Sequence, residues 1–446
     1  MQIPSTAPLF AWGYMEDSPS LHTVGELLGT IPDGPLLQAL REHRGRGRNE
    51  YPVETLWGVV LLAIMLRHTS IEACLAELRR NAGLRLPIGI RTEAEVPKAW
   101  NVSRFLRTLG DARFRPLSQR AFGHMVERLG LAVPSLGAET AGDSMGVSAR
   151  PDRAEAPADL PQPTGGRKEY TDEEGRVTKV VEWFGYKLHQ VVDVRHEVAL
   201  AYGITSTKEG DAETLPELAD GAAARLPAGR IRSLAYDRAA DSEEFHRALA
   251  QRGIAPVVQM RELWKTGRDR PLPGHEQAPV ALTYDEAGTV HCWDDSGPVP
   301  VRRRMTYFGH EASRGTLKYR CPAATAEWRC GCERKCNQGR IYGLTVRVKR
   351  EIDQRRFPPV PRATKTFERL YKGRTAVERV NGRLRLFWGA DDGNITGAAR
   401  FHAYIGAMML VHLAFATLLA GQSRTPGTLG SMGLGPVQKA LRDRRL

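Results

Sequence analysis

The sequence predicts an α/β protein with a helical N-terminal domain, a mixed core and a β-rich subdomain inserted into that core. Three observations predict this class. Apolar residues recur at the helical period through residues 1–132, whereas residues 133–260 contain short apolar strands separated by helical stretches. Residues 261–360 alternate between apolar and polar side chains and contain turn signals. Helical patterns return over residues 361–424, so we expect this segment to complete the core, and residues 425–446 form a tail.

The composition indicates a globular chain with a polyanionic partner. The 446 residues leave room for two or three domains, and 41% of them are hydrophobic. Lys and Arg number 64 against 51 Asp and Glu, which gives a net charge of +13. Nucleic acid is the commonest partner of such a protein, although arginine-rich chains without one also exist. Six cysteines make no disulfide framework and the first residues do not resemble a signal peptide, so we expect a cytoplasmic protein.

The N-terminal domain is expected either to recognise DNA through its helices or to be a plain helical bundle with a solvated basic face. Two helical stripes are clear, and Ser70 can cap the second of them. Their members are Trp57, Val60, Leu61, Ile64 and then Ile71, Cys74, Leu75, Leu78. No helix-turn-helix signature decides between the two interpretations.

The core should begin with a strand within residues 138–149 that ends near Asp143. An Asp at a strand end projects a carboxylate into a cleft and suits a metal ligand, but a turn also explains it. Residues 150–170 are rich in Pro, Ala and Gly and predict a mobile loop or flap. Three strands of a meander follow, at 177–184, 186–194 and 198–205.

A second aspartate follows a strand further along the core. Residues 231–236 predict a short strand that leads directly into Asp237, and a helix follows with Ser242 near its start. This order places a carboxylate at the carboxyl edge of a sheet, where ligand sites of α/β proteins gather. Another strand is expected at 254–260.

The inserted subdomain contains a cysteine cluster that can form a tetrahedral Zn²⁺ site. Its spacing matches no standard zinc finger. Reduced thiols without metal, or three of them together with His291 or Cys292, are the alternatives. The four clustered residues are Cys321, Cys330, Cys332 and Cys336.

Residues 371–388 predict one helix with an unusual polar face. Tyr371, Arg374, Glu378 and Arg385 lie within roughly 60° of one another on a helical wheel. The face is either an ion-paired surface or a carboxylate that holds a divalent cation beside a polyanion. Residues 403–420 form an apolar stretch of about the minimum length for a membrane span, but we expect a buried core helix instead.

The spacing of this face resembles the Tyr-x2-Arg-x3-Glu-x6-Lys signature of bacterial insertion-sequence transposases, with Arg385 in place of the final Lys. These enzymes have an RNase H-like catalytic core with an Asp-Asp-Glu triad. The resemblance implies that Glu378 is the third catalytic carboxylate and that the chain has an RNase H-like core, a helical N-terminal domain and an inserted β-rich subdomain.

The same resemblance extends to the segments around both aspartates. Asp143 is followed by Ser144, as in the first strand of the family. Asp237 and the pair Asp241-Ser242 match the family's Asp-Lys-Gly-Tyr-Asp-Ser, although the Gly-Tyr is lost. Residues 185–189 resemble the family's Gly-x-Lys-x-His stretch, with His189 equally explained as a core residue, and Asp211 is expected to cap a helix.

The resemblance implies a mechanism and partners. Asp143, Asp237 and Glu378 would share two Mg²⁺ (or Mn²⁺) ions for phosphoryl transfer. The partners would be double-stranded DNA, as element ends and target, and further copies of the chain in a homodimer or larger assembly near the bacterial nucleoid. A nuclease of defence or repair and a non-catalytic DNA-binding descendant are the alternatives. The residues expected to contact DNA are Tyr371, Arg374, Arg385, Lys187 and Arg238.

Overall fold

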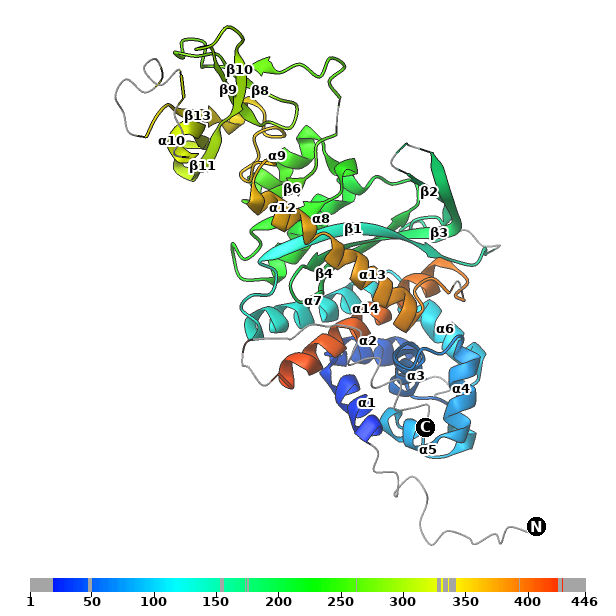
Figure 1. Ribbon diagram of the computed structural model, residues 1–446. Coiled ribbons are helices and arrows are strands. Elements are labelled where there is room, and N and C mark those ends of the chain that lie inside the picture. Colours follow the sequence, from blue (N-terminus) through cyan, green and yellow to red (C-terminus); the bar gives the residue numbers. More distant parts are fainter. Residues whose placement is uncertain are drawn as a thin grey trace, which may run out of the picture.

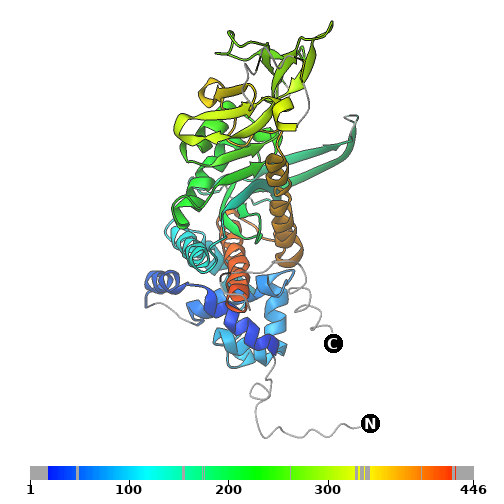
Figure 2. The same cartoon turned by 60° about the vertical axis from the view of Figure 1, so that its left-hand side comes forward.

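The protein has three parts arranged along one axis. The computed structural model describes residues 19–46, 50–152, 156–172, 174, 176–261, 263–326, 330, 331, 336, 342–392, 394–423 and 427. The N-terminal helices lie at one end, a mixed sheet with its helices lies in the middle, and the inserted subdomain lies at the far end (Figures 1 and 2). The central sheet therefore separates the N-terminal helices from the inserted subdomain.

The N-terminal part is helical, as predicted. Ser70 caps α4 because its hydroxyl accepts a hydrogen bond from the amide of Ala73 at 3.1 Å. The helices are α1 (Pro19–Thr30), α2 (Gly34–Arg44), α3 (Val53–Met65), α4 (Ile71–Arg80), α5 (Ala82–Arg85), α6 (Ala99–Leu109) and α7 (Arg115–Ala132).

The last helix, α14 (Ala398–Gly421), is the buried centre of this helical layer. It packs against α1, α3, α6 and α7, and Gly110 at the end of α6 touches its Ala399 so closely that a side chain would collide with the carbonyl. The helix is long and apolar enough to cross a membrane, but 67% of its most apolar window is buried inside the protein. The prediction of a core helix over 403–420 is confirmed by this burial.

The central sheet combines antiparallel and parallel strands. Its order is β2-β3-β1-β5-β6, with β4 also paired to β3. The pairs β2–β3, β3–β4 and β1–β3 are antiparallel, whereas β1–β5 and β5–β6 are parallel. The strands are β1 (Glu139–Ser148), β2 (Thr164–Thr171), β3 (Val177–Asp193), β4 (Ala199–Ser206), β5 (Ser233–Tyr236) and β6 (Ala255–Val258), and the connecting helices are α8 (Asp211–Arg225) and α9 (Glu243–Gln251).

Three details of the predicted strands were wrong. Strand β1 does not end near Asp143, because its residues as far as Ser148 continue to pair with β3. The two strands expected at 177–184 and 186–194 are one continuous strand, which passes through Gly185. Part of the expected loop at 150–170 is β2, because those residues find hydrogen-bonding partners in the first half of β3.

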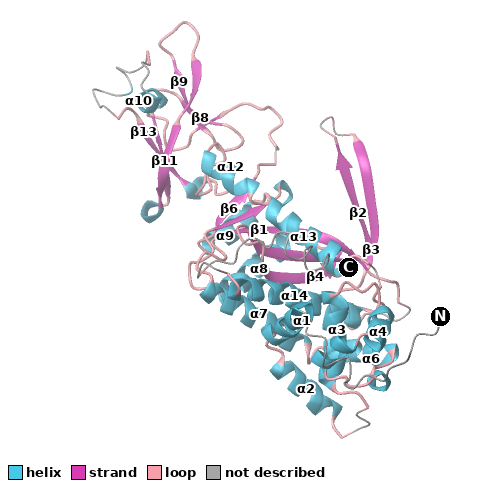
Figure 3. Cartoon of the chain, turned by 60° about the horizontal axis from the view of Figure 1, so that its bottom comes forward, coloured by secondary structure: helices cyan, strands magenta, loops and turns pink. Residues whose placement is uncertain are grey.

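Strands β2 and β3 form a two-stranded ribbon that projects from the body of the protein (Figure 3). Trp183 covers its root: a Cβ at Gly146 or at Gly166 would lie only 2.4 Å from the indole ring. The indole Nε1 also donates to the carbonyl of Tyr186 at 3.2 Å. These two glycines therefore make room for the side chain that joins the ribbon to β1.

The inserted subdomain has its own hydrophobic core and two small sheets, as the alternation of residues 261–360 predicts. One sheet has the order β10-β9-β8-β7 and the other β11-β12-β13. The elements are β7 (Arg270–Pro271), β8 (Leu282–Tyr284), β9 (Val290–Asp294), β10 (Val301–Arg304), β11 (Thr306–Glu311), β12 (Thr316–Arg320), α10 (Pro322–Ala326) and β13 (Thr345–Lys349).

The helix predicted over 371–388 is in fact two helices. Helix α12 (Lys365–Lys372) ends at Gly373, and α13 (Thr375–Trp388) begins directly after it. A Cβ at Gly373 would meet Val194 at 2.8 Å, so glycine allows the break to approach the end of β3. Helix α12 packs on β5 and β6, whereas α13 packs on β1 and β3.

Candidate active site

Two neighbouring parallel strands bring Asp143 and Asp237 together. Ala141 of β1 pairs with Ala235 of β5, and Asp143 and Asp237 each lie two residues further along, close enough to interact electrostatically. Neighbouring strands lie about 4.8 Å apart. Burial, together with the nearby Asp237 carboxylate, raises the pKa of Asp143 to about 6, although Lys168 and Arg374 act in the opposite direction.

The end of β5 fixes the position of Asp237. Strand β5 is fully buried, so its last residue, Tyr236, is held in the core and Asp237 emerges at the sheet edge. The Asp237 carboxylate accepts a hydrogen bond from the amide of Ala239 at 2.9 Å and caps a single 3₁₀ turn. Arg238, predicted to contact DNA, is exposed beside it.

Glu378 lies in the first turn of α13, next to Arg374. The Arg374 guanidinium contacts the Glu378 carboxylate, with Nη1 2.8 Å from Oε1. Partial burial lowers the pKa of Arg374, but Glu378, Tyr371 and Asp143 together raise it above its ordinary value. Arg374 therefore interacts electrostatically with carboxylates from both α13 and β1, in agreement with the packing of α13 on β1.

Buried polar contacts hold α13 against the sheet. Glu197, in the turn between β3 and β4, binds Arg379 and Arg383 of α13 at 2.5 Å each. Asn381 accepts a hydrogen bond from the side chain of Gln190 on β3 at 2.7 Å. These contacts fix the rotation of α13 and therefore the side on which Glu378 emerges.

The other members of the predicted polar face have separate partners. The ring of Tyr371 stacks on Phe367 of α12, with centroids 5.8 Å apart. Arg385 donates from Nη2 to the carbonyl of Gly146 on β1 at 2.9 Å, and its Nε lies 3.7 Å from Asp391. Arg385 therefore lies beside the same strand that carries Asp143.

Asp211 has a different role from the one that the sequence predicts. Gly210, not Asp211, occupies the N-cap of α8, and the Asp211 carboxylate instead accepts a hydrogen bond from Ser144 at 3.0 Å. Lys187 and His189 lie 3.5 and 3.4 Å from the same carboxylate. Lys187, predicted to contact DNA, also donates to the carbonyl of Glu209 at 2.9 Å. The sequence-based predictions treated these residues separately and did not include the cluster.

The oxygen ligands of the site fit a hard divalent cation, although the described side chains are not arranged around one. No group of three or more His, Cys, Asp or Glu residues among the described residues could hold a metal ion in this arrangement. Asp143 and Asp237 nevertheless supply adjacent carboxylates, the ligand type that Mg²⁺ prefers. The raised pKa of Asp143 shows that its charge is poorly compensated, and a cation would remove that penalty.

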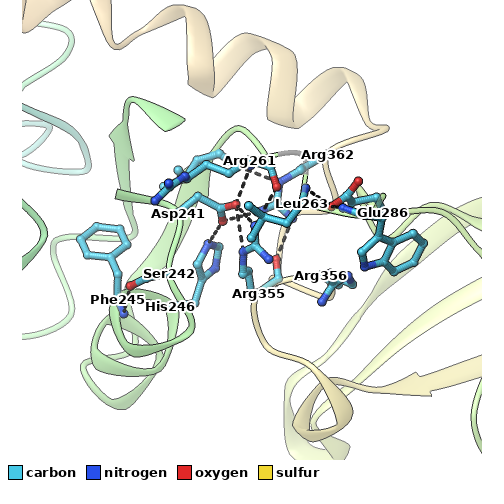
Figure 4. Close-up of polar contacts among 12 residues, drawn as sticks. Asp241, Ser242, Phe245, His246, Arg261, Leu263, Glu286, Arg355, Arg356 and Arg362 are labelled. Carbon is cyan, nitrogen blue, oxygen red and sulfur yellow. Dashed lines mark hydrogen bonds and ion pairs between the residues drawn. The ribbon is translucent and has the colours of Figure 1, made fainter. Parts of the chain in front are cut away.

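A buried ionic cluster, which we call the Asp241 clasp, joins the loop after Asp237 to the inserted subdomain (Figure 4). One Asp241 oxygen accepts from Arg355 at 2.7 and 2.9 Å and from the amide of Arg261 at 2.7 Å. The other accepts from His246 at 3.0 Å and Arg362 at 3.3 Å. Burial would raise the pKa of Asp241, but the hydrogen bonds from His246 and Arg355 lower it to about 2. The clasp thus ties both ends of the insertion to the core.

The described cysteines of the inserted subdomain lie in or against one hydrophobic core, which also contains Cys292 from outside the predicted cluster. Cys321 and Cys330 are buried in the subdomain core, and Cys336 packs against it. Cys332 lies outside the described residues. Burial raises the pKa of Cys292 on β9 to about 12, and the neighbouring Cys321 and Cys330 add to this rise. Cys292 is therefore closer to the cluster than its distance in sequence suggests.

Comparison with protein families identifies matches over most of the chain. A family described as the transposase DDE domain matches residues 143–414, which is more than half of the chain. A second family, described as a transposase domain (DUF772), matches residues 14–108 in the helical N-terminal part. A comparison with curated proteins finds no match. The first match begins at Asp143 and includes Asp237 and Glu378.

Proposed function

Because the chain belongs to the family of the transposase DDE domain, we propose that it cuts the ends of an insertion sequence and joins them to target DNA by two-metal phosphoryl transfer. The family makes the chain a DNA transposase and a polynucleotidyl transferase. The parallel pairing of β1 with β5, which brings the strand that carries Asp143 next to the strand that leads into Asp237, supports the proposal, together with the packing of α13 on β1.

The proposed catalytic core is RNase H-like. Its support is the strand arrangement, in which antiparallel strands β4, β3 and β1 lead into the parallel strands β5 and β6. In this arrangement Asp143 lies within β1, Asp237 follows the end of the neighbouring strand β5, and α13 packs on β1 and β3. The proposed site would therefore take two carboxylates from the sheet and one from α13.

Asp143, Asp237 and Glu378 are the proposed ligands of the divalent ions that DDE transposases generally use. Bound there, two Mg²⁺ (or Mn²⁺) ions would lower the pKa of the attacking water or 3′-hydroxyl and stabilise the leaving oxygen. Glu378 has a half-exposed side chain and is paired with Arg374, so it must exchange this partner to act as a ligand. Released from Glu378, Arg374 is free to bind a phosphate of the DNA.

The remaining DNA contacts are assigned from position and charge. Arg238 is exposed next to Asp237, and Arg385 lies beside β1. Tyr371 is half-buried at the end of α12 and offers a ring edge to sugar or base. Lys187 acts mainly through Asp211, so its contribution to DNA binding is indirect. The helical N-terminal domain would recognise the element ends, and two or more copies of the chain would bring both ends together.

The test is DNA cleavage by the purified protein and by Asp237→Ala, with Asp220→Ala as a control. Asp220 is an exposed aspartate in an ion pair with Arg252 on another surface. Asp237→Ala should reduce cleavage by at least about a hundredfold, because several kcal/mol of transition-state stabilisation are lost, while DNA binding is retained. Equal cleavage by Asp237→Ala would refute the assigned site.

The same assay separates the alternatives. A nuclease would cleave DNA without joining the ends to a target, and a non-catalytic descendant would bind DNA without cleaving it. Short inverted repeats on both sides of the gene would support transposition independently of the assay.

A further inference from the structure

A basic cavity of about 570 Å³ lies between α12 and the inserted subdomain. Strand β10 contributes Arg304, and the segment that enters and forms α12 contributes Arg362, Lys365 and Lys372. The volume is within the range of roughly 300–1,000 Å³ that is typical of ligand sites. The walls come from the inserted subdomain and from the segment that contains α12, so the cavity depends on how these two parts pack together.

The cavity has an excess of positive charge. Four cationic side chains line it against one carboxylate, Glu368, which pairs with Lys372 at 2.8 Å. Arg362 is neutralised by Asp241. Arg304 and Lys365 are exposed and form no ion pair with any described residue; Glu368 interacts electrostatically with Lys365 as well as with Lys372, so one carboxylate balances only part of the positive charge of the lining. Such an arrangement favours an anionic ligand.

The Asp241 clasp makes one wall of the cavity rigid (Figure 4). Arg362 donates to the carbonyls of Val258 and Arg355 at 2.8 and 2.7 Å, in addition to its contact with Asp241. The start of α12 is fixed because the hydroxyl of Thr364 accepts a hydrogen bond from the amide of Phe367 at 3.1 Å. A ligand therefore finds these groups already ordered, which lowers the entropy lost on binding.

The position of the cavity relates it to the proposed catalytic site. Lys365 begins α12, and Glu378 lies in the next helix. Thirteen residues at 1.5 Å each correspond to roughly 20 Å. At 3.4 Å per step of a DNA strand, this is the length of about six nucleotides. A DNA strand that passes the candidate active site and continues along α12 would reach the cavity.

We propose that this cavity binds backbone phosphates of the substrate DNA about six nucleotides from the scissile bond, through Arg304 and Lys365. The inference rests on the proposed function, because it names a contact with the same DNA. The two side chains would bind backbone phosphates and not the bases, so they should strengthen binding equally for all DNA sequences.

The test measures the salt dependence of DNA affinity for the double variant Arg304→Ala, Lys365→Ala. The matched control is Arg247→Ala, Lys349→Ala, which removes the same two residue types from exposed ion pairs with Glu243 and Glu351 outside the cavity. Fluorescence anisotropy of a labelled DNA duplex gives the slope of log affinity against log salt. Each lost phosphate contact reduces this slope by about 0.9, so the cavity variant should lose about 2 and the control nothing comparable.

A second measurement locates the contact along the DNA. Neutral methylphosphonate linkages placed one at a time should weaken binding of the unaltered protein roughly tenfold near the sixth nucleotide from the cleavage point, and should not weaken the cavity variant there. Equal slopes of log affinity against log salt for the cavity variant and the unaltered protein would overturn this inference and leave the proposed function standing. Absence of DNA binding by the unaltered protein would instead overturn the proposed function. A normal melting temperature shows that each variant is folded.

Discussion

Replacement of Asp241 by Asn is expected to destabilise the junction between the core and the inserted subdomain. The Asp241 side chain is 0% exposed, and its two arginine partners are 9% and 6% exposed. Asn keeps the shape of the side chain but removes its charge. Arg355 and Arg362 would then be buried without a counter-charge, because burial lowers the pKa of His246 and keeps that residue neutral.

The magnitude follows from the same contacts. The pKa of Asp241 is lowered from 3.8 to about 2, and each unit corresponds to about 1.4 kcal/mol, so the charged form is favoured by roughly 2–3 kcal/mol. Breaking a buried ion pair by removing one partner typically costs about 3–5 kcal/mol. We therefore expect a loss of roughly 3 kcal/mol in the free energy that holds the insertion to the core. Because the folded-state pKa is depressed, this stabilisation is present above pH 4 and is lost only as the pH falls toward about 2.

The assay is thermal unfolding together with limited proteolysis at neutral pH. Asp241→Asn should lower the melting temperature and expose new cleavage sites near residues 261 and 355, where the insertion meets the core. The control is Asp220→Asn, which breaks the exposed pair with Arg252 and should cost less than about 1 kcal/mol. A melting temperature and a proteolysis pattern of Asp241→Asn that equal those of the control would refute the reasoning.

Three further predictions follow from other sites. Asp143→Asn should raise the melting temperature of the metal-free protein, because a buried carboxylate with a pKa of about 6 destabilises the folded state at pH 7 by roughly 1–3 kcal/mol. Mg²⁺ should stabilise the unaltered protein and not this variant. Identical Mg²⁺ responses would contradict the proposed ligand role. Burial lowers the pKa of His412 to about 3, so below pH 6.5 the unfolded chain takes up a proton that the folded chain cannot. The free energy of unfolding should therefore fall by as much as about 1.4 kcal/mol per pH unit as the pH decreases. The same dependence of the unfolding free energy on pH in His412→Gln would count against this assignment. Zinc in the inserted subdomain stays a prediction. Metal analysis should find about one zinc ion per chain, and this ion should be lost in Cys321→Ser and kept in Cys74→Ser. An unaltered protein that contains no zinc would exclude the site.

Much of the local structure could be predicted because it depends on neighbouring residues. The stripes of α3 and α4 follow the helical period, and Ser70 and Ser242 cap helices through their own side chains. The apolar stretch within α14 could be assigned to the core because the rest of the chain is not membrane-like. Asp237 could be placed at a strand end because a short apolar strand leads directly into it.

Other features could not be predicted from local patterns. The break at Gly373 depends on the close approach of Val194, which directly follows strand β3 and is distant in the sequence. Strand β2 lies in a polar, Pro-rich segment, and it forms only because the first half of β3 offers an unpaired edge. Asp211 resembles a helix cap in sequence, but Ser144, Lys187 and His189 from two strands determine where its carboxylate points.

The sequence by itself determined which residues are candidates for the chemistry: two aspartates that follow or lie within strands, and a glutamate beside an arginine on a helix. Only the tertiary structure decided that Asp143 and Asp237 lie near each other on neighbouring strands, that Arg374 forms an ion pair with Glu378, and that Asp241 joins the insertion to the core. The physical reason is that side-chain periodicity and capping act over a few residues. Strand register and buried ion pairs are instead fixed by contacts between segments that are far apart in the chain.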